Sequence, residues 1–357
     1  MNPLNLDELE QAAAERLSAM ANDYYAGAAR DGITLKGNRA AWDRLRLYYR
    51  VMVDVAQRDL STTVLGQRLA LPILAAPTAF HRLAHPDGEL ATARGCGVAG
   101  AGMVLSTLST VAMEEVAAVA TGPLWFQLYI YRDRAVTRSL VQRAEAAGYS
   151  ALVLTVDAAI IGARETDARN RFHLPDSMTA ANLVGTGMDV IPAGEGGSGL
   201  ETYVRDLLTP KLTWADLDWL VAQTRLPVLV KGVIRADDAV RAVAHGASGV
   251  IVSNHGGRQL DGAPPTAEAL PAVVEAVGGR VAVLVDGGIR RGSHVLRALA
   301  MGADAVLVGR PVLWGLAVDG ADGVSGMLAM LAAELDEAMA LCGCEDINRI
   351  PEDLVRA

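Results

Sequence analysis

The chain has 357 residues, of which 51% are hydrophobic and 4% aromatic, and its formal net charge is −9 at pH 7. The acidic balance and the lack of a basic block argue against nucleic acid and against an anionic membrane surface as partners. The N-terminus lacks the charged and then apolar pattern of a secretion signal, and no apolar stretch reaches roughly 18 residues, so we expect a cytoplasmic protein that does not enter a membrane. The three cysteines, Cys96, Cys342 and Cys344, form neither a metal-ligand nor a disulfide pattern, and no metal site is expected.

The N-terminal part, residues 1–70, is predicted to be a helical lead-in segment and not a separate domain. Apolar residues recur at helical spacing over 5–29, which indicates one or two helices ending at Asp23-Tyr24-Tyr25-Ala26-Gly27. Residues 30–70 are polar and rich in arginine, with short extended pieces. The adjacent tyrosines either pack in the core or send one hydroxyl to a functional site.

From residue 71 the pattern alternates between apolar strands, polar turns and Ala-rich helices, and it predicts a (β/α)8 TIM barrel over 71–345 within a single domain, 1–357. Continuous apolar strands fit a parallel sheet covered on both faces, although an open doubly wound sheet remains an alternative. A last helix over about 323–342 would close the barrel. The expected strands are 72–76, 103–106, 125–129, 151–156, 228–231, 250–253, 281–286 and 305–309, and the expected helices are 89–100, 113–120, 135–147, 214–224, 236–245, 267–277 and 293–300.

One connection is out of scale, because about 70 residues separate the fourth and fifth strands, and loops of that length usually act as lids. We therefore predict a lid loop over about 157–212, on the face where the strands end; it includes the glycine-rich stretch 193–199. A different glycine motif, Gly95-Cys96-Gly97-Val98-Ala99-Gly100, matches the dinucleotide pattern GxGxxG. It lies inside a helix that precedes a strand, however, whereas the dinucleotide motif must follow a strand and open a helix.

The most informative strand end is the sixth, Ser253-Asn254-His255-Gly256-Gly257-Arg258-Gln259-Leu260-Asp261. Because active sites of such barrels lie at the carboxyl ends of the strands, His255 could serve as a base and Arg258 as an anion anchor. Taken alone, the stretch could equally be a surface turn. The other strands end in polar residues too: Pro77-Thr78-Ala79, Ser106, Gln127 with Tyr129, Thr155 with Asp157, and Lys231.

The loops after the seventh and eighth strands predict a phosphate site. Gly287, Gly288 and Gly309 leave backbone N–H groups uncovered, and Arg290 and Arg310 add positive charge. The alternative is two ordinary glycine turns.

The remaining strand-end residues favour a cofactor with a planar polar ring, because Thr78, Ser106, Gln127 and Thr155 are neutral hydrogen-bonding groups. Lys231 lies on a buried strand and needs an anionic partner. That partner could be a reduced flavin or a structural carboxylate such as Asp286.

With these motifs the chain resembles the FMN-dependent L-2-hydroxy acid oxidase and dehydrogenase family over nearly its whole length. The most specific match is the stretch 253–261. Supporting matches are Ala76-Pro77-Thr78-Ala79, Gln127-Leu128-Tyr129, Thr155-Val156-Asp157, Lys231-Gly232, Asp286-Gly287-Gly288 and Gly309-Arg310-Pro311.

The resemblance implies FMN as cofactor and a role for each motif residue. His255 would be the base, with Asp157 favouring its charged form. Arg258 and Arg164 would bind the substrate carboxylate, Tyr25 and Tyr129 the carboxylate or the 2-hydroxyl, and Lys231 would stabilise the reduced flavin. The implied FMN-binding residues are Pro77, Thr78, Ala79, Ser106, Gln127, Thr155, Lys231, Ser253, Asp286, Gly287, Gly288, Arg290, Gly309 and Arg310.

Two departures from the family bear on specificity. Ala163 replaces one of two adjacent arginines in the segment after the fourth strand, and Leu108 replaces the aromatic residue of glycolate oxidases. Leu108 and Ile161 suggest a pocket for a bulky or aromatic side chain, as in bacterial 4-hydroxymandelate oxidases, which the stretch 81–89 also resembles. A small substrate of the lactate or glycolate kind is the alternative.

Oxygen is the expected electron acceptor. Ala79 matches the oxidases, no haem domain precedes residue 1, and 170–210 contains no membrane-inserting segment. The alternatives are a dehydrogenase that uses a quinone, an FMN-dependent isomerase on the same barrel, and a non-catalytic FMN-binding or phosphate-binding protein. The family's tetramers make a homotetramer the expected assembly.

Overall fold

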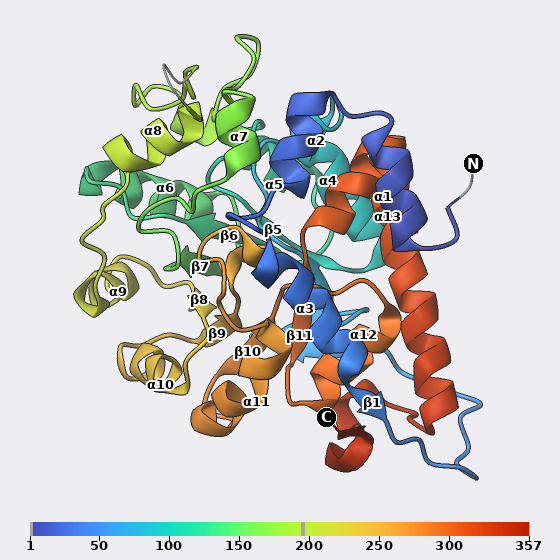
Figure 1. Ribbon diagram of the computed structural model, residues 1–357. Coiled ribbons are helices and arrows are strands. Elements are labelled where there is room, and N and C mark those ends of the chain that lie inside the picture. Colours follow the sequence, from blue (N-terminus) through green and yellow to red (C-terminus); the bar gives the residue numbers. More distant parts are fainter. Residues whose placement is uncertain (1–2, 194–196, 357) are drawn as a thin grey trace.

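The computed structural model describes residues 3–193 and 197–356, and its centre is a closed barrel of parallel strands (Figure 1). The strands follow one another around the barrel in chain order, and the last pairs with the first through Val306–Ile73 and Val308–Ala75. The predicted (β/α)8 barrel is therefore confirmed, and the open sheet is wrong. The barrel strands are β4 (Ile73–Ala75), β5 (Gly102–Leu105), β6 (Leu124–Leu128), β7 (Leu152–Thr155), β8 (Val228–Val233), β9 (Gly249–Val252), β10 (Ala282–Val285) and β11 (Ala305–Val308).

Alternate residues of these strands face inward and form a core of their own. Trp125, Ile251 and Leu284 belong to this interior cluster, together with Val64 and Leu69 of a hairpin formed by β2 (Thr62–Val64) and β3 (Gln67–Leu69). The hairpin therefore covers the end of the barrel opposite the strand carboxyl ends. The other side chains of each strand pack against the outer helices.

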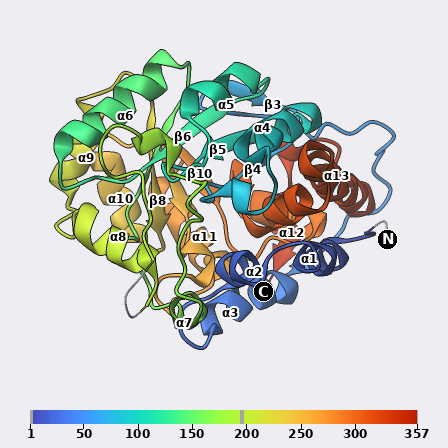
Figure 2. The same cartoon turned by 90° about the horizontal axis from the view of Figure 1, so that it is seen from above.

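The outer helices form a ring around the strands when the molecule is seen from above (Figure 2). Most of the predicted helices agree with the structure to within one or two residues. The helices of the ring are α4 (Gly88–Ala99), α5 (Met113–Val119), α6 (Arg134–Ala146), α9 (Trp214–Val221), α10 (Ala236–Ala244), α11 (Thr266–Val277), α12 (Gly292–Ala300) and α13 (Arg310–Cys342).

The last helix, α13, begins 13 residues before the expected start at 323, since 323 − 310 = 13. It is kinked where Asp319 and Gly320 leave helical geometry, and it packs against α4, α12 and α1 (Leu6–Ala14). Its length and composition alone would allow it to cross a membrane. A Cβ on Gly95 would lie 2.6 Å from the Ala321 carbonyl oxygen, so this glycine of the GxGxxG match serves helix packing, not nucleotide binding.

The lead-in segment contains α1, α2 (Ala19–Ala26) and a third helix, α3 (Ile33–Arg44), which the sequence did not predict. The side chains that α3 buries include Thr34, Asn38 and Trp42, and two of these three are polar. A helix that buries polar side chains has no hydrophobic periodicity to reveal it. After α3, β1 (Arg46–Leu47) pairs with β12 (Val355–Arg356) near the C-terminus.

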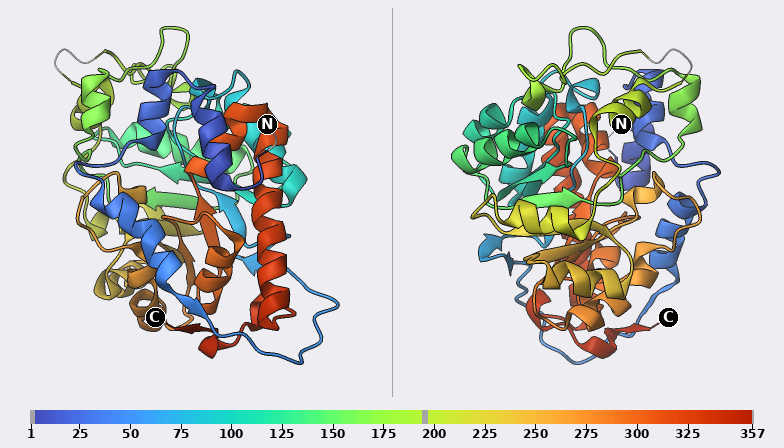
Figure 3. Two further views of the ribbon diagram at one scale, coloured as in Figure 1. Left: turned by 45° about the vertical axis from the view of Figure 1, so that its right-hand side comes forward. Right: turned by 90° about the vertical axis from the view of Figure 1, so that its left-hand side faces the viewer.

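The segment expected as a lid contains α7 (Glu165–Arg169) and α8 (Gly199–Leu207) and lies at the top of the molecule in both views of Figure 3. Buried Phe172, Leu183 and Leu200 anchor it. Part of the glycine-rich stretch, 194–196, lies outside the described residues. Short 3-10 turns occur at His81–Leu83, Ala181–Leu183, His255–Gly257, Ile347–Arg349 and Glu352–Leu354.

Candidate active site

A cavity opens at the carboxyl ends of the strands and leaves about 1170 Å³ of space between its lining atoms, part of it open to solvent. Four of the predicted site residues, Gln127, Thr155, Asp157 and Ser253, lie behind the wall. The predicted residues that line the cavity are Tyr25, Pro77, Thr78, Ala79, Ser106, Leu108, Tyr129, Ile161, Arg164, Lys231, His255, Arg258, Asp286, Gly287, Gly288, Arg290, Gly309 and Arg310.

His255 lies three residues after the end of β9 and has a left-handed backbone, with φ of 58°. Its Nδ1 lies 2.9 Å from Asp157 Oδ1, which leaves Nε2 for a ligand in the cavity. Burial lowers the pKa of His255, although Asp157 counteracts this, while His255 holds the pKa of Asp157 below its ordinary value in spite of burial. The pair therefore consists of a neutral imidazole and a carboxylate, which suits a general base.

Two arginines lie close to this pair. Arg258 donates from Nη1 to the carbonyl oxygens of Tyr24 (2.6 Å) and Gly27 (2.9 Å), and burial lowers its pKa to about 10. Arg164 Nη1 lies 3.6 Å from Asp167 Oδ2, and both side chains are buried. Burial raises the pKa of Asp167. Two guanidinium groups thus face one carboxylate, and the remaining positive charge favours an anionic ligand.

The tyrosines require a correction to the sequence prediction. The Tyr25 hydroxyl donates to the Phe80 carbonyl oxygen at 2.7 Å, so its proton is already engaged. Tyr24, which the sequence did not select, also lines the cavity, with its ring 4.9 Å from the Arg258 guanidinium and stacked on Phe172. Tyr24 and Tyr129 are thus better placed than Tyr25 to hydrogen-bond a ligand.

Lys231 has the structural partner that the sequence left open as an alternative. Its ammonium lies 3.0 Å from Asp286 Oδ2 and donates to Ser253 Oγ at 2.9 Å. Burial lowers the pKa of Lys231, but Asp286 and Asp157 outweigh it and raise the pKa, so the side chain stays charged. Asp286 Oδ1 and Asp157 Oδ2 are buried without a hydrogen-bond partner among the described residues.

Behind the wall runs a chain of neutral groups. Ser106 Oγ donates to Gln127 Oε1 (3.3 Å), and Gln127 Nε2 donates to Thr155 Oγ1 (3.1 Å). Thr78 Oγ1 lies 2.6 Å from Nε2 of His81, a buried residue that the sequence prediction did not include. The sequence signal that could have identified His81 was its position, three residues after Thr78 at the same strand end.

The two glycine loops form the other end of the cavity. Gly287 and Gly288 have φ of 95° and 82°, and a Cβ on Gly288 would lie 2.5 Å from the Asn38 backbone carbon, so α3 packs directly on this turn. Trp42 Nε1 donates to the Gly287 carbonyl oxygen at 2.8 Å, and Asn38 exchanges hydrogen bonds with Asn254. The helix α3 therefore supports both this turn and the turn that carries His255.

Arg290 and Arg310 lie beside these glycines, and in the described part of the chain their guanidinium groups make hydrogen bonds only to carbonyl oxygens. Arg290 donates to Ile289, and Arg310 donates to Tyr25, Gly27 and Gly256. Burial lowers the pKa of Arg290 to about 10 and that of Arg310 well below its ordinary value. Recessed guanidinium groups without a carboxylate partner favour an anion such as a phosphate.

The far wall is apolar. Leu108 is 5% exposed, and Ile161 lies near it, with Leu200, Val204 and Leu208 supplied by the lid segment. The sequence prediction missed these three residues of the lid, whose signal was the apolar face of α8. Among the residues described, no three His, Cys, Asp or Glu side chains come together as a metal site would require.

Comparisons with known proteins agree with this geometry. A family model described as FMN-dependent dehydrogenase matches residues 13–357. The chain is 55% identical over 353 residues to an L-lactate oxidase of Nostoc sp. (98% of this chain, 97% of the relative) and 48% identical to 2-Hydroxyacid oxidase 1 of Homo sapiens (98% and 96%). A crystal structure of mandelate oxidase with (S)-4-hydroxymandelic acid superposes with a TM-score of 0.94 at 44% identity (99% and 98%). The resemblance inferred from the motifs is confirmed, and this chain belongs to the FMN-dependent dehydrogenase family.

Proposed function

We propose that the protein oxidises L-2-hydroxy acids to 2-oxo acids with FMN and passes the electrons to O2, which yields H2O2. The observation that carries this proposal is the position of the His255–Asp157 pair beside two arginines, in the same cavity as a second pair of arginines on the glycine loops. A base beside a carboxylate-binding group suits a 2-hydroxy acid. The second pair suits the phosphate of a cofactor.

The residues present fit FMN. Gly287, Gly288 and Gly309 line the cavity together with Arg290 and Arg310, whose charges suit a phosphate, and neutral Thr78 and Ser106 line the wall where a polar ring would need hydrogen bonds. The charged Lys231 lies nearby and donates a hydrogen bond to Ser253. Gln127 accepts a hydrogen bond from Ser106 and donates one to Thr155, which holds this part of the cavity wall in place. When bound, FMN supplies the two-electron acceptor that protein side chains lack.

The chain's own residues bind the acid and move its proton. Arg258 and Arg164 bind the carboxylate, for which planar guanidinium groups are suited. Nε2 of neutral His255 takes a proton from the CHOH group, and Asp157 stabilises the imidazolium that forms. Tyr24 and Tyr129 donate hydrogen bonds to the acid; burial raises the pKa of both, which keeps their hydroxyls protonated.

For the side chain of the acid, we propose a bulky or aromatic group. Leu108, Ile161 and the apolar residues of α8 surround this end of the cavity, and a related mandelate oxidase binds (S)-4-hydroxymandelic acid. A small acid is the second candidate, because the 55% identical relative is an L-lactate oxidase. O2 as acceptor is supported by the oxidase names of these relatives.

The test is anaerobic mixing of the purified yellow protein with L-mandelate, L-lactate, glycolate and the D-enantiomers, followed by air. We expect L-mandelate to bleach the flavin fastest and air to restore it quickly. Faster bleaching by L-lactate would assign the small substrate, and slow recovery in air would point to another acceptor. Failure of every L-2-hydroxy acid to bleach the flavin would refute the reaction class.

We also propose a homotetramer. Tyr49, Val51 and Met52 are 67%, 72% and 100% exposed in one short stretch, and so large an apolar surface is typical of a subunit contact. Light scattering should give about four times the 37.4 kDa chain mass. A monomer would contradict this.

A further inference from the structure

The first turn of α12 carries a buried histidine, His294, that the proposed reaction does not use. It is 2% exposed and lies just after the glycine turn that ends in Arg290. The backbone N–H of Arg290 donates to His294 Nδ1 at 3.3 Å. Because a backbone N–H can only donate, Nδ1 must be the acceptor, without a proton.

The other ring nitrogen faces an acceptor. His294 Nε2 lies 2.9 Å from Asp43 Oδ1 on α3, and a carboxylate accepts, so Nε2 carries the proton. These two contacts favour a neutral imidazole with its proton on Nε2, although the Gly288 carbonyl also faces the ring. His294 thus accepts the backbone N–H of the residue before the N-cap Arg291, one residue earlier than the glutamate or glutamine of a capping box does.

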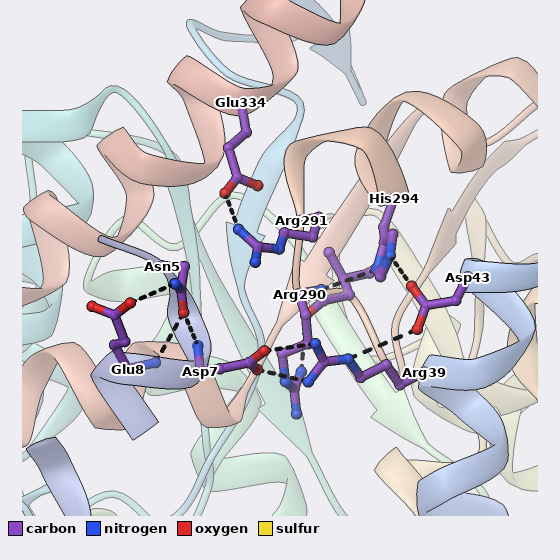
Figure 4. A network of polar contacts seen from close by, with 10 residues as sticks. Asn5, Asp7, Glu8, Arg39, Asp43, Arg290, Arg291, His294 and Glu334 are labelled. Atoms are coloured by element: carbon purple, nitrogen blue, oxygen red, sulfur yellow. Dashed lines mark hydrogen bonds and ion pairs between the residues drawn. The ribbon is translucent and has the colours of Figure 1, made fainter. Parts of the chain in front are cut away.

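The contacts continue to the N-terminal helices (Figure 4). Arg39 Nε lies 3.9 Å from Asp43 Oδ2, and the same guanidinium binds both carboxylate oxygens of Asp7 on α1 at 2.6 and 2.8 Å. His294 thus connects the Arg290 backbone to α3 and, through Arg39, to α1.

We propose that His294 is a positioning residue for the phosphate-binding turn, and that its protonation weakens FMN binding by releasing the Arg290 backbone. The inference rests on the proposed binding of the FMN phosphate beside Gly287, Gly288 and Arg290. It adds to that function an acid-sensitive step in cofactor retention.

The physical reason is that protonation changes the hydrogen-bond partner of His294 Nδ1. A proton on Nδ1 would face the Arg290 N–H and repel it, whereas the Gly288 carbonyl, which also faces the ring, would attract it. The turn would therefore rearrange at the residues that cradle the phosphate.

The surroundings set the pH range. Burial lowers the pKa of His294 and Arg297 adds to this, whereas Asp43 and the Gly288 carbonyl oppose it, and the net result lies below the ordinary value. Arg39 faces Asp43, and Arg291 of the same turn is paired with Glu334 of α13 at 2.8 Å. The ring is thus neutral at neutral pH, and FMN affinity is lost only as the pH falls below about 6.5 toward the lowered pKa.

The experiment measures the FMN dissociation constant by flavin fluorescence at about pH 7.5 and about pH 5.5, for the wild type and for His294→Gln, whose amide oxygen can accept the same N–H at either pH. We expect similar affinities at the higher pH, and binding by the wild type that weakens relative to the variant as the pH falls, by at most about fivefold, the loss of one hydrogen bond. The phosphate of FMN titrates equally in both, and riboflavin, which lacks it, should show no difference between the two proteins.

A second variant tests the chain of contacts. Asp43→Asn removes the carboxylate that favours the protonated ring, so the loss of FMN should shift to lower pH. Equal pH dependence in the wild type and His294→Gln would overturn the proposal, as would an Asp43→Asn profile that does not move. If the wild type binds no FMN at about pH 7.5, the proposed function itself fails.

Discussion

The two ends of the cavity balance their charges in opposite ways. At the substrate end three charged groups have a charged partner, His255 with Asp157, Lys231 with Asp286, and Arg164 with Asp167, while Arg258 is held by carbonyl oxygens. At the glycine-loop end, Arg290 and Arg310 donate to carbonyl oxygens, and no carboxylate within the described residues forms a salt bridge with either. The first end can move a proton without building up charge. The second has positive charge that suits a permanent anion.

This difference separates two kinds of substitution. Changes at the paired end should slow the reaction and leave FMN bound, whereas changes at the unpaired end should release FMN and leave the chemistry of the remaining flavoprotein intact.

The largest effect is expected at the base. His255→Asn should slow flavin reduction by roughly 10²–10⁴-fold, because the proton has no acceptor, while the FMN dissociation constant stays within about twofold. Anaerobic stopped-flow absorbance gives the rate, and flavin fluorescence gives the affinity. If the variant loses FMN but reduces its remaining flavin at the normal rate, His255 binds the cofactor and is not the base.

Next in size is Asp157→Asn, which we expect to slow flavin reduction by about 10–1,000-fold, because a neighbouring carboxylate raises a histidine pKa by about 1–3 units. In the wild type the rate should rise with pH through a pKa below about 6.5, since burial depresses the pKa of His255. Without the carboxylate, this rise of the rate with pH should occur at still lower pH. An unchanged pH profile would show that Asp157 does not act on His255.

The matched pair Arg290→Met and Arg291→Met tests the unpaired end. Loss of Arg290 should weaken FMN binding by about 10–150-fold, the value of one hydrogen bond to a charged group, and leave riboflavin binding unchanged. Arg291 is paired with Glu334, and its loss should change the FMN dissociation constant by less than about threefold. Equal losses of FMN in both variants would contradict a specific role for Arg290.

The smallest effects should distinguish the neighbouring tyrosines. Tyr24→Phe should raise KM by about 2–10-fold with an unchanged Tm, whereas Tyr25→Phe should lower the free energy of unfolding by about 1–2 kcal/mol and leave KM unchanged, because the Phe80 carbonyl loses its donor. The reverse outcome would restore Tyr25 as the substrate residue.

The barrel and most of its strand ends could be predicted because buried parallel strands are continuous apolar runs, each followed by a polar turn. The helix α3 could not, since Thr34 and Asn38 are buried through hydrogen bonds and not through hydrophobicity. The choice between Tyr24 and Tyr25 depends on a helix rotation of about 100° per residue, which the sequence does not fix.

The charge partners were also only partly visible in the sequence. The sequence allows two anionic partners for Lys231, and the structure shows its contact with one of them, Asp286. All the carbonyl groups that hold Arg258, and two of the three that hold Arg310, belong to residues 24–27, more than 200 positions earlier. Such contacts depend on how α2 docks, and no local pattern encodes them.

The pairing of β4 with β11 has a consequence for how the protein is made. It joins residue 73 to residue 306, and the cavity draws on residues from Tyr24 to Leu313. Contacts between such distant parts of a chain form late, because loop closure must precede them. During synthesis the cofactor therefore has no complete site until nearly the whole polypeptide has emerged, so a truncated product would leave the ribosome colourless.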